Sequence, residues 1–130
     1  MLASGQASST EIRLLRFPPV HGNSVVFSYA GDLWSCELDG GIAKRLTSHV
    51  GPELNARFSP DGKTIAFMGG YDGMMNVYVM PSEGGEPKRV TFGTGETMIG
   101  GWTKDGKILY ADWDQNTNPD RPQPAAWFVD

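Results

Sequence analysis

The chain has 130 residues, of which 39% are hydrophobic and 20% charged, and its formal net charge is −4. This composition excludes an intrinsically disordered chain, and the acidic balance argues against a general nucleic-acid-binding protein. No run of about 18 apolar residues is present to span a membrane, and 17 glycines with 9 prolines indicate many tight turns rather than long helices.

Short motifs recur along the chain. The turn and strand at residues 61–67 resemble those at 21–27 and 105–110. Three further motif pairs are each separated by 44 residues: Gly40-Gly41 and Gly84-Gly85, Arg45-Leu-Thr47 and Arg89-Val-Thr91, Asp32-Leu-Trp34 and Asn76-Val-Tyr78. A period of roughly 40–45 residues built from short strands is typical of four-stranded propeller blades. We therefore predict an all-β protein of antiparallel four-stranded blades, with about two and three-quarter blades of an incomplete β-propeller.

Residues 1–12 are predicted to be a disordered or processed N-terminal segment, because their small and polar residues do not form an intact signal peptide. Blade one is predicted over residues 13–49. Its strands are expected at residues 13–17, 24–29, 32–38 and 43–47. Pro18-Pro19 ends the first strand, and Asp39-Gly40-Gly41 is a hairpin signal.

Blade two is predicted over residues 50–94, with strands at 54–59, 63–68, 76–80 and 88–92. Pro60-Asp61-Gly62 supplies its first turn, because proline presets φ and glycine accepts a positive φ. Blades one and three should each cover one face of this blade. We therefore expect a buried core of Phe58, Ile65, Phe67, Val77 and Tyr78.

Blade three is predicted over residues 95–130, with strands at 97–103, 107–111 and 126–130 and without a fourth strand. No segment shows a 3.6-residue apolar period, so no helix longer than about two turns is expected. The incomplete array should expose sheet faces at both ends and an unpaired strand edge. We expect the chain to be a fragment of a longer protein or to self-associate, and a charge at Phe128 to weaken association through that edge.

The two histidines, His21 and His49, are the only candidate imidazole bases. A serine hydrolase also needs a nucleophile, an orienting acid and oxyanion donors, and no Gly-x-Ser-x-Gly elbow is present. His49 is interpreted as a loop residue that orders the turn at Thr47-Ser48. No catalytic and no cofactor-binding residue is predicted.

An alternating run of oxygen-bearing side chains follows the second strand of blade three: Asp112, Asp114, Asn116, Asn118 and Asp120. A calcium loop of the EF-hand type would need glycine at Thr117 and glutamate at Gln123. A solvated loop is therefore favoured over a calcium site, and no metal site is predicted.

The single cysteine, Cys36, cannot form an intrachain disulfide, so an oxidising compartment has no support from cysteine usage. We expect a buried structural thiol and a cytoplasmic protein, with a periplasmic location after loss of a signal peptide as the alternative. The basic pairs Lys44-Arg45 and Lys88-Arg89 are interpreted as a solvated outer-strand face rather than a nucleic-acid surface.

The ordered set of motifs resembles the N-terminal propeller of tricorn protease and its bacterial homologues over roughly residues 13–112. Its most specific parts are Gly31-Asp-Leu-Trp34 and Thr47-Ser-His49, because the Ser-Pro-Asp-Gly-Lys sequence at residues 59–63 also occurs in Tol-type propellers and prolyl-oligopeptidase relatives. The other motifs that carry the resemblance are Leu15-Arg-Phe-Pro18, His21-Gly22, Val25-Val-Phe27, Gly40-Gly41, Arg45-Leu46, Arg57-Phe58, Tyr71-Asp-Gly73, Asn76-Val-Tyr78, Gly84-Gly-Glu-Pro-Lys-Arg89, Gly101-Trp102 and Asp105-Gly-Lys107.

The resemblance implies a large oligomeric serine protease that degrades peptides, in which propellers precede a separate catalytic part and gate or channel substrate and product. No part of that catalytic region is recognisable here. The expected function is that of a non-catalytic propeller segment, which gates or channels peptides and supports assembly, with peptides or proteins as its partners. The alternative is a Tol-like or stand-alone propeller module that binds protein partners, and an unrelated enzyme is a remote third class.

Overall fold

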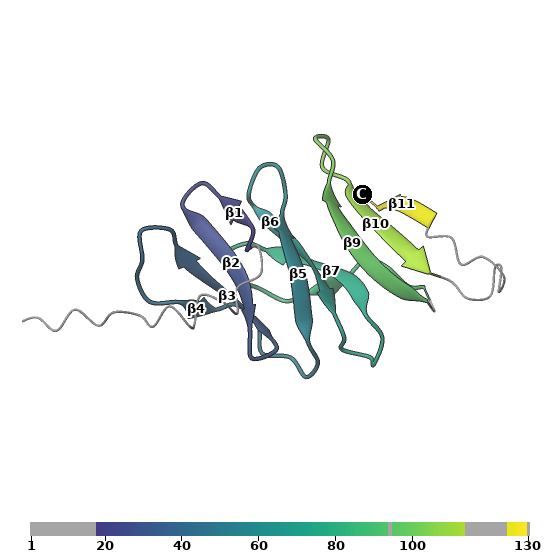
Figure 1. The fold of residues 1–130 in the computed structure, drawn as a ribbon, viewed down its shortest axis with the longest axis horizontal. Coiled ribbons are helices and arrows are strands. Elements are labelled where there is room, and N and C mark those ends of the chain that lie inside the picture. The colour runs from purple at the N-terminus through teal and green to yellow at the C-terminus, as the bar shows by residue number, and fades with distance from the viewer. Residues whose placement is uncertain (1–17, 94, 114–124, 130) are drawn as a thin grey trace, which may run out of the picture.

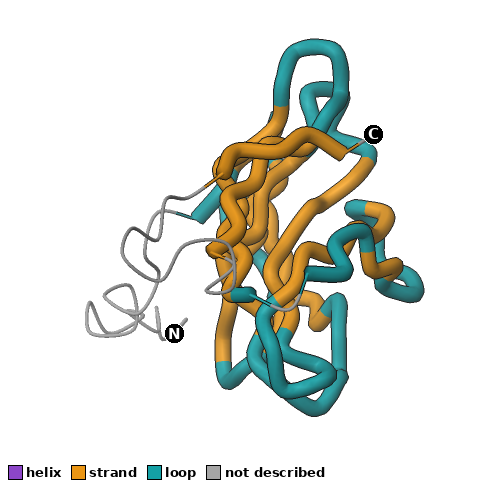
Figure 2. The backbone as a smooth tube through the Cα atoms, turned by 90° about the vertical axis from the view of Figure 1, so that its right-hand side faces the viewer, coloured by secondary structure: helices purple, strands orange, loops and turns teal. Residues whose placement is uncertain are grey.

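The computed structural model describes residues 18–93 and 95–113 and the backbone of 125–129; for Trp113, too, only the backbone is described. Within these ranges the chain forms three antiparallel sheets that follow one another along the molecule (Figure 1). The backbone there consists of strands, turns and loops, without a helix (Figure 2). The predicted all-β architecture of successive antiparallel blades is confirmed.

The first sheet has the strand order β1-β2-β3-β4. Its strands are β1 (Val20–His21), β2 (Ser24–Tyr29), β3 (Asp32–Glu37) and β4 (Lys44–Arg45). Ala30 and Gly31 connect β2 to β3 with φ angles of 52° and 90°, as a two-residue hairpin turn with positive φ at both positions requires. The strand predicted at residues 13–17 lies outside the described residues, and the edge next to β2 is formed by β1, where a turn was predicted.

The second sheet repeats this order as β5-β6-β7-β8. Its strands are β5 (Glu53–Phe58), β6 (Thr64–Gly69), β7 (Asn76–Pro81) and β8 (Lys88–Arg89). β6 and β7 pair over their full length, from Thr64 opposite Pro81 to Gly69 opposite Asn76. In the turn after β5, the Gly62 amide donates to the Ser59 carbonyl oxygen at 2.9 Å, and Gly62 has a φ of 73° that only glycine adopts readily.

The outermost strands β4 and β8 are two residues long, shorter than the predicted strands at 43–47 and 88–92. The shortening has a side-chain cause. Thr47 Oγ1 accepts a hydrogen bond from the Leu33 amide, and Thr91 Oγ1 accepts one from the Val77 amide, each at 2.9 Å. In each sheet, the amide of β3 or β7 therefore donates to a threonine hydroxyl instead of a main-chain carbonyl oxygen. The backbone pairing with β4 or β8 ends at this point.

The third sheet has the order β11-β10-β9. Its strands are β9 (Glu96–Trp102), β10 (Ile108–Trp113) and β11 (Ala125–Val129). β11 pairs with β10 from Ile108 opposite Val129 to Asp112 opposite Ala125, which confirms the strand predicted near the C-terminal end. A register shift between Leu109 and Tyr110 interrupts the pairing of β10 with β9. Among the described strands, β11 has a partner on one side only.

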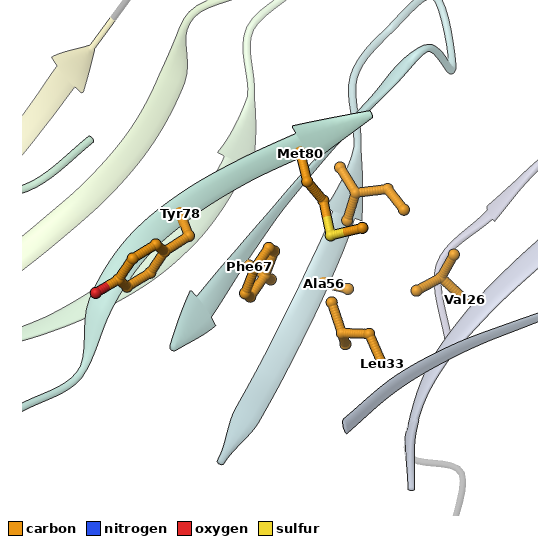
Figure 3. Packing of buried hydrophobic residues seen from close by; sticks show 7 residues of the cluster. Val26, Leu33, Ala56, Phe67, Tyr78 and Met80 are labelled. Carbon is orange, nitrogen blue, oxygen red and sulfur yellow. The ribbon is translucent and has the colours of Figure 1, made fainter. Parts of the chain in front are cut away.

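Two apolar clusters hold the three sheets together. The cluster between the first and second sheets consists of Val26, Leu33, Ala56, Ile65, Phe67, Tyr78 and Met80 (Figure 3). The cluster between the second and third sheets consists of Ala66, Met68, Val77, Ile99 and Ile108. Side chains of β6 alternate between the two clusters, as successive strand residues point to opposite faces. The second sheet is therefore buried on both of its faces.

The predicted core of the second blade is correct for Ile65, Phe67, Val77 and Tyr78, which are at most 5% exposed. It is wrong for Phe58, which is half-buried and packs against the margin of the first cluster. Phe58 ends β5, so its ring lies beside the turn, with its centroid 5.8 Å from that of His21.

Replacing Phe67 by alanine should lower the free energy of unfolding by about 3–5 kcal/mol, because the ring is fully buried between two sheets. Phe92 is 74% exposed, so Phe92→Ala should change stability by less than about 0.5 kcal/mol. Urea unfolding followed by circular dichroism measures both variants. Equal losses would contradict the placement of the core.

Candidate functional site

Each of the two histidines lies beside an aromatic ring. His21 is the last residue of β1, and its ring faces Phe58. His49 is exposed in the loop after β4, where its ring centroid lies 4.6 Å from that of Tyr71. In the described part of the chain, no hydrogen bond joins either imidazole to a serine, threonine or cysteine side chain. The structure thus brings neither histidine to a nucleophile, and the lack of catalytic residues stays a prediction.

A buried polar cluster lies where the first sheet meets the second. Glu53, at the start of β5, is 0% exposed. Its carboxylate accepts hydrogen bonds from the Leu33 amide at 3.0 Å, from the Tyr71 hydroxyl at 2.5 Å and from the Thr47 hydroxyl. Burying a carboxylate is unfavourable unless hydrogen bonds replace its water. Three donors from different segments meet this requirement for Glu53.

The main chain and the surrounding rings reinforce this cluster. The Glu53 amide donates to the Gly31 carbonyl oxygen at 2.9 Å, which ties β5 to the turn between β2 and β3. Tyr71 packs on Tyr78 with ring centroids 4.5 Å apart. Burial, followed by the hydrogen bond to Glu53, raises the pKa of the Tyr71 hydroxyl well above its usual range. Tyr71 therefore remains a hydrogen-bond donor, and Glu53 joins two sheets through both side chain and backbone.

The junction between the second and third sheets has the hydrogen bond from a backbone amide to a threonine, but it has no buried glutamate. Thr91 Oγ1 accepts from the Val77 amide and donates to Asn76 Oδ1 at 3.2 Å. The residue equivalent to Glu53 is Thr97, 44 positions later. Thr97 is 2% exposed, and its hydroxyl has no hydrogen-bond partner. Oδ1 of Asp112, which lies opposite Thr97 in the sheet register, is also buried and unpaired.

Sequence reasoning missed the role of Glu53, because a charged residue is read as a surface residue. A signal was nevertheless present in the spacing. Glu53 follows Thr47 by six residues, and Thr97 follows Thr91 by six residues. Thr47 and Thr91 occupy the same position in two repeats, whereas Glu53 in one repeat is replaced by Thr97 in the next.

Three of the four basic residues on β4 and β8 have local partners: Lys44, Arg45 and Arg89. Arg45 forms an ion pair with Asp32 at 2.6 Å, and Arg89 forms one with Asp72 at 3.1 Å. Arg89 has a different partner because Asn76, the equivalent of Asp32, carries no charge. Lys44 Nζ donates to the Glu83 carbonyl oxygen at 2.8 Å. The sequence analysis interpreted these pairs as a solvated outer-strand face, and three of the four residues are exposed: Lys44, Arg45 and Lys88.

The remaining candidate residues do not assemble into a site. Of the predicted oxygen-rich loop only Asp112 is described; the positions from 114 onward lie outside the described residues. No group of three His, Cys, Asp or Glu side chains in the described ranges could hold a metal ion. Cys36, predicted to be buried, is half-buried near the end of β3. None of the described segments forms a helix with the length and apolar character to cross a membrane.

Comparison with known families gives a match to the model described as "Tricorn protease N-terminal beta propeller domain" over residues 12–128. Tricorn protease homolog 1 of Streptomyces coelicolor is 44% identical over 96 residues, which cover 73% of this chain and 9% of that protein. The tricorn protease of Thermoplasma acidophilum is 33% identical over 106 residues, which cover 74% of this chain and 10% of that protein. The chain thus spans about a tenth of the length of these relatives.

Solved structures share the fold. The β-propeller domain of the trilobed protease from Pyrococcus furiosus matches with a TM-score of 0.65 at 21% identity, covering 89% of this chain and 38% of that one. A candidate TolB from Agrobacterium tumefaciens matches with a TM-score of 0.65 at 23% identity, covering 74% of this chain and 36% of that one. At these identities the likeness concerns the fold alone, and it agrees with consecutive blades of an incomplete β-propeller.

Replacing one buried threonine of each junction by valine, Thr47 at the first and Thr97 at the second, should distinguish the two junctions. Thr47→Val should lower the free energy of unfolding by about 1–3 kcal/mol, because Glu53 and the Leu33 amide lose a buried partner. Thr97→Val should be neutral or stabilising, because the hydroxyl that it removes is buried and unpaired. Thermal and urea unfolding measure both. A larger loss for Thr97→Val would contradict this description of the junctions.

Proposed function

Because the chain belongs to the family of the tricorn protease N-terminal β-propeller domain, we propose that it acts as a non-catalytic propeller segment of a tricorn-like serine protease. The observation that carries the proposal is the family match over residues 12–128, which includes all three sheets except Val129, the last residue of β11. Catalysis on this view belongs to a separate part of the protein. This assignment is supported by the lack, among the described residues, of a hydrogen bond from His21 or His49 to a serine, threonine or cysteine side chain.

The proposed role is to gate or channel peptides and to support assembly. Stacked blades suit this role, because their side chains are used to pack sheet against sheet and the turns between strands remain at the surface. Peptides are therefore the proposed small partners. The remainder of a longer chain, or a second copy of this chain, is the proposed macromolecular partner.

A Tol-like or stand-alone module that binds protein partners is the second candidate. The observation that favours it is the likeness in fold to the TolB candidate of Agrobacterium tumefaciens. The reading frame downstream of codon 130 separates the two candidates. Further blades followed by a catalytic serine region support the protease segment, whereas a stop after a closed ring of blades supports the binding module.

We also propose residues 13–49, 50–94 and 95–130 as the three blade units. A cytoplasmic location is proposed with them, on the ground that the single Cys36 cannot form an intrachain disulfide. Detection of the native protein in a periplasmic fraction would contradict this location.

The 130-residue chain should not hydrolyse peptides. Acyl transfer needs a serine or cysteine nucleophile with a base in hydrogen-bond reach, and neither histidine has such a partner in the described residues. Purified protein is tested with a panel of fluorogenic peptides. Turnover that disappears in Ser48→Ala or His49→Ala, but not in Ser82→Ala, would overturn the assignment of a non-catalytic segment.

Self-association should accompany the incomplete array, because a strand with one free edge is a template for pairing. The sedimentation coefficient should rise with protein concentration. A charge placed in β11 by Phe128→Lys should weaken this rise, and Val50→Lys, at a loop residue that is 92% exposed, serves as the control. A monomer at all concentrations with a single high melting transition would contradict the proposal.

A further inference from the structure

The first junction, between the first and second sheets, is crossed by both side-chain and main-chain hydrogen bonds. The Glu53 carboxylate accepts from the Leu33 amide at 3.0 Å, and the Glu53 amide donates to the Gly31 carbonyl oxygen at 2.9 Å. Farther out, Lys44 Nζ donates to the Glu83 carbonyl oxygen at 2.8 Å. Three segments of the first sheet are therefore bonded to the second sheet.

The second junction, between the second and third sheets, has a cross-sheet bond at one end of β9 (Figure 1). Trp102, the last residue of β9, donates from Nε1 to the Arg57 carbonyl oxygen at 3.1 Å. Near the start of β9, Thr97 stands in the place of Glu53. Among the described residues, no bond joins the Thr97 amide to Met75, which is the equivalent of Gly31. The two ends of β9 are therefore attached differently.

The Thr97 side chain faces the second sheet. Thr97 and Ile99 are buried and alternate along β9 with the exposed residues Glu96 and Met98, and Ile99 belongs to the apolar cluster between the second and third sheets. Alternate residues of a strand share a face. Docking of the third sheet on the second therefore buries Thr97.

Two oxygens at this end of the junction are buried without a partner. The Thr97 hydroxyl and Oδ1 of Asp112 are shut off from solvent and make no hydrogen bond, although the two residues lie opposite each other in the pairing of β9 with β10. Asp112 Oδ2 rests against the segment that joins the two sheets, because a Cβ at Gly93 would lie 2.6 Å from it. Closing the junction here removes water from a carboxylate and a hydroxyl without replacing it, which is unfavourable.

We propose that the second junction is a hinged seam, at which the third sheet opens from the second at the Thr97 end and pivots about the Trp102 end. Opening returns water to Thr97 and Asp112, which offsets part of the cost of exposing the apolar cluster. The first junction stays closed, since opening it would leave Glu53 without its donors. This opening is a property of the fold and goes beyond either candidate function.

Hydrogen exchange of the intact 130-residue chain, followed by mass spectrometry in dilute solution below the unfolding transition, tests the order of opening. The protected amides of β9 and β10 should exchange roughly tenfold or more faster than those of β2 and β3. The first and third sheets each have one described neighbouring sheet, so fraying of a terminal sheet alone gives equal rates. Equal rates, or faster exchange in β2 and β3, overturn the proposal.

Two valine variants identify the junction that controls each sheet. Thr97→Val removes a buried and unpaired hydroxyl, so it should slow the exchange of β9 and β10 roughly fivefold. Thr47→Val removes a hydrogen bond to Glu53 and should speed the exchange of β2 and β3. It should leave β9 and β10 unchanged, because the first junction stays closed while the third sheet opens.

Faster exchange of β9 and β10 in Thr47→Val would mean that the third sheet exchanges only when the whole chain unfolds, and it would contradict the seam. Unchanged exchange of these strands in Thr97→Val would contradict it as well. The double variant Thr97→Glu with Asp112→Gly copies the opposed pair of the first junction, Glu53 and Gly69. It should also slow the exchange of β9 and β10, which keeps the test decisive if Thr97→Val fails to fold.

Discussion

The dry contact between the first and second sheets is the interaction on which the described structure depends. A sheet of two to four short strands is marginal in isolation, because one of its faces must be covered to offset the entropy of ordering the chain. Here Leu33 and Val26 from one sheet meet Phe67 and Ile65 from the next in a cluster that excludes water. The second sheet is covered again on its other face, which makes it the centre of the array. Strand pairing within each sheet gains its stability from this contact between sheets.

Polar groups at the sheet junctions decide how firmly the sheets are aligned. Apolar contacts allow sliding, whereas a buried carboxylate that accepts three hydrogen bonds permits one alignment. Glu53 is this carboxylate at the first junction. It accepts hydrogen bonds from Leu33 in β3, from Thr47 in the segment after β4, and from Tyr71 in the loop after β6. The second junction relies on Asn76 and Thr91 within one sheet, together with the indole bond of Trp102 across to Arg57. The two junctions are therefore similar in shape and different in chemistry.

The repeat spacing predicted the three sheets and most strand limits, because Gly and Pro punctuate the turns and the alternating apolar residues mark the faces. Sequence reasoning was less accurate where one residue's role depends on another blade. The outer strands are short because Thr47 and Thr91 substitute a hydroxyl for a carbonyl, and Phe58 is half-buried because it ends its strand next to His21. The burial of Glu53 and Thr97 was not predicted, since it arises only when sheets from neighbouring repeats meet.

The exchange of glutamate for threonine between the two junctions also bears on how such arrays grow. A duplicated copy of the second blade, placed directly after the original, would bring a glutamate to the position that Thr97 now occupies. The Thr91 hydroxyl and the Val77 amide already lie where the first junction offers Thr47 and Leu33 to Glu53. A tandem copy of the second blade would therefore find the partners of its glutamate already in place. The third blade differs from the second at this position, where Thr97 is buried with an unpaired hydroxyl.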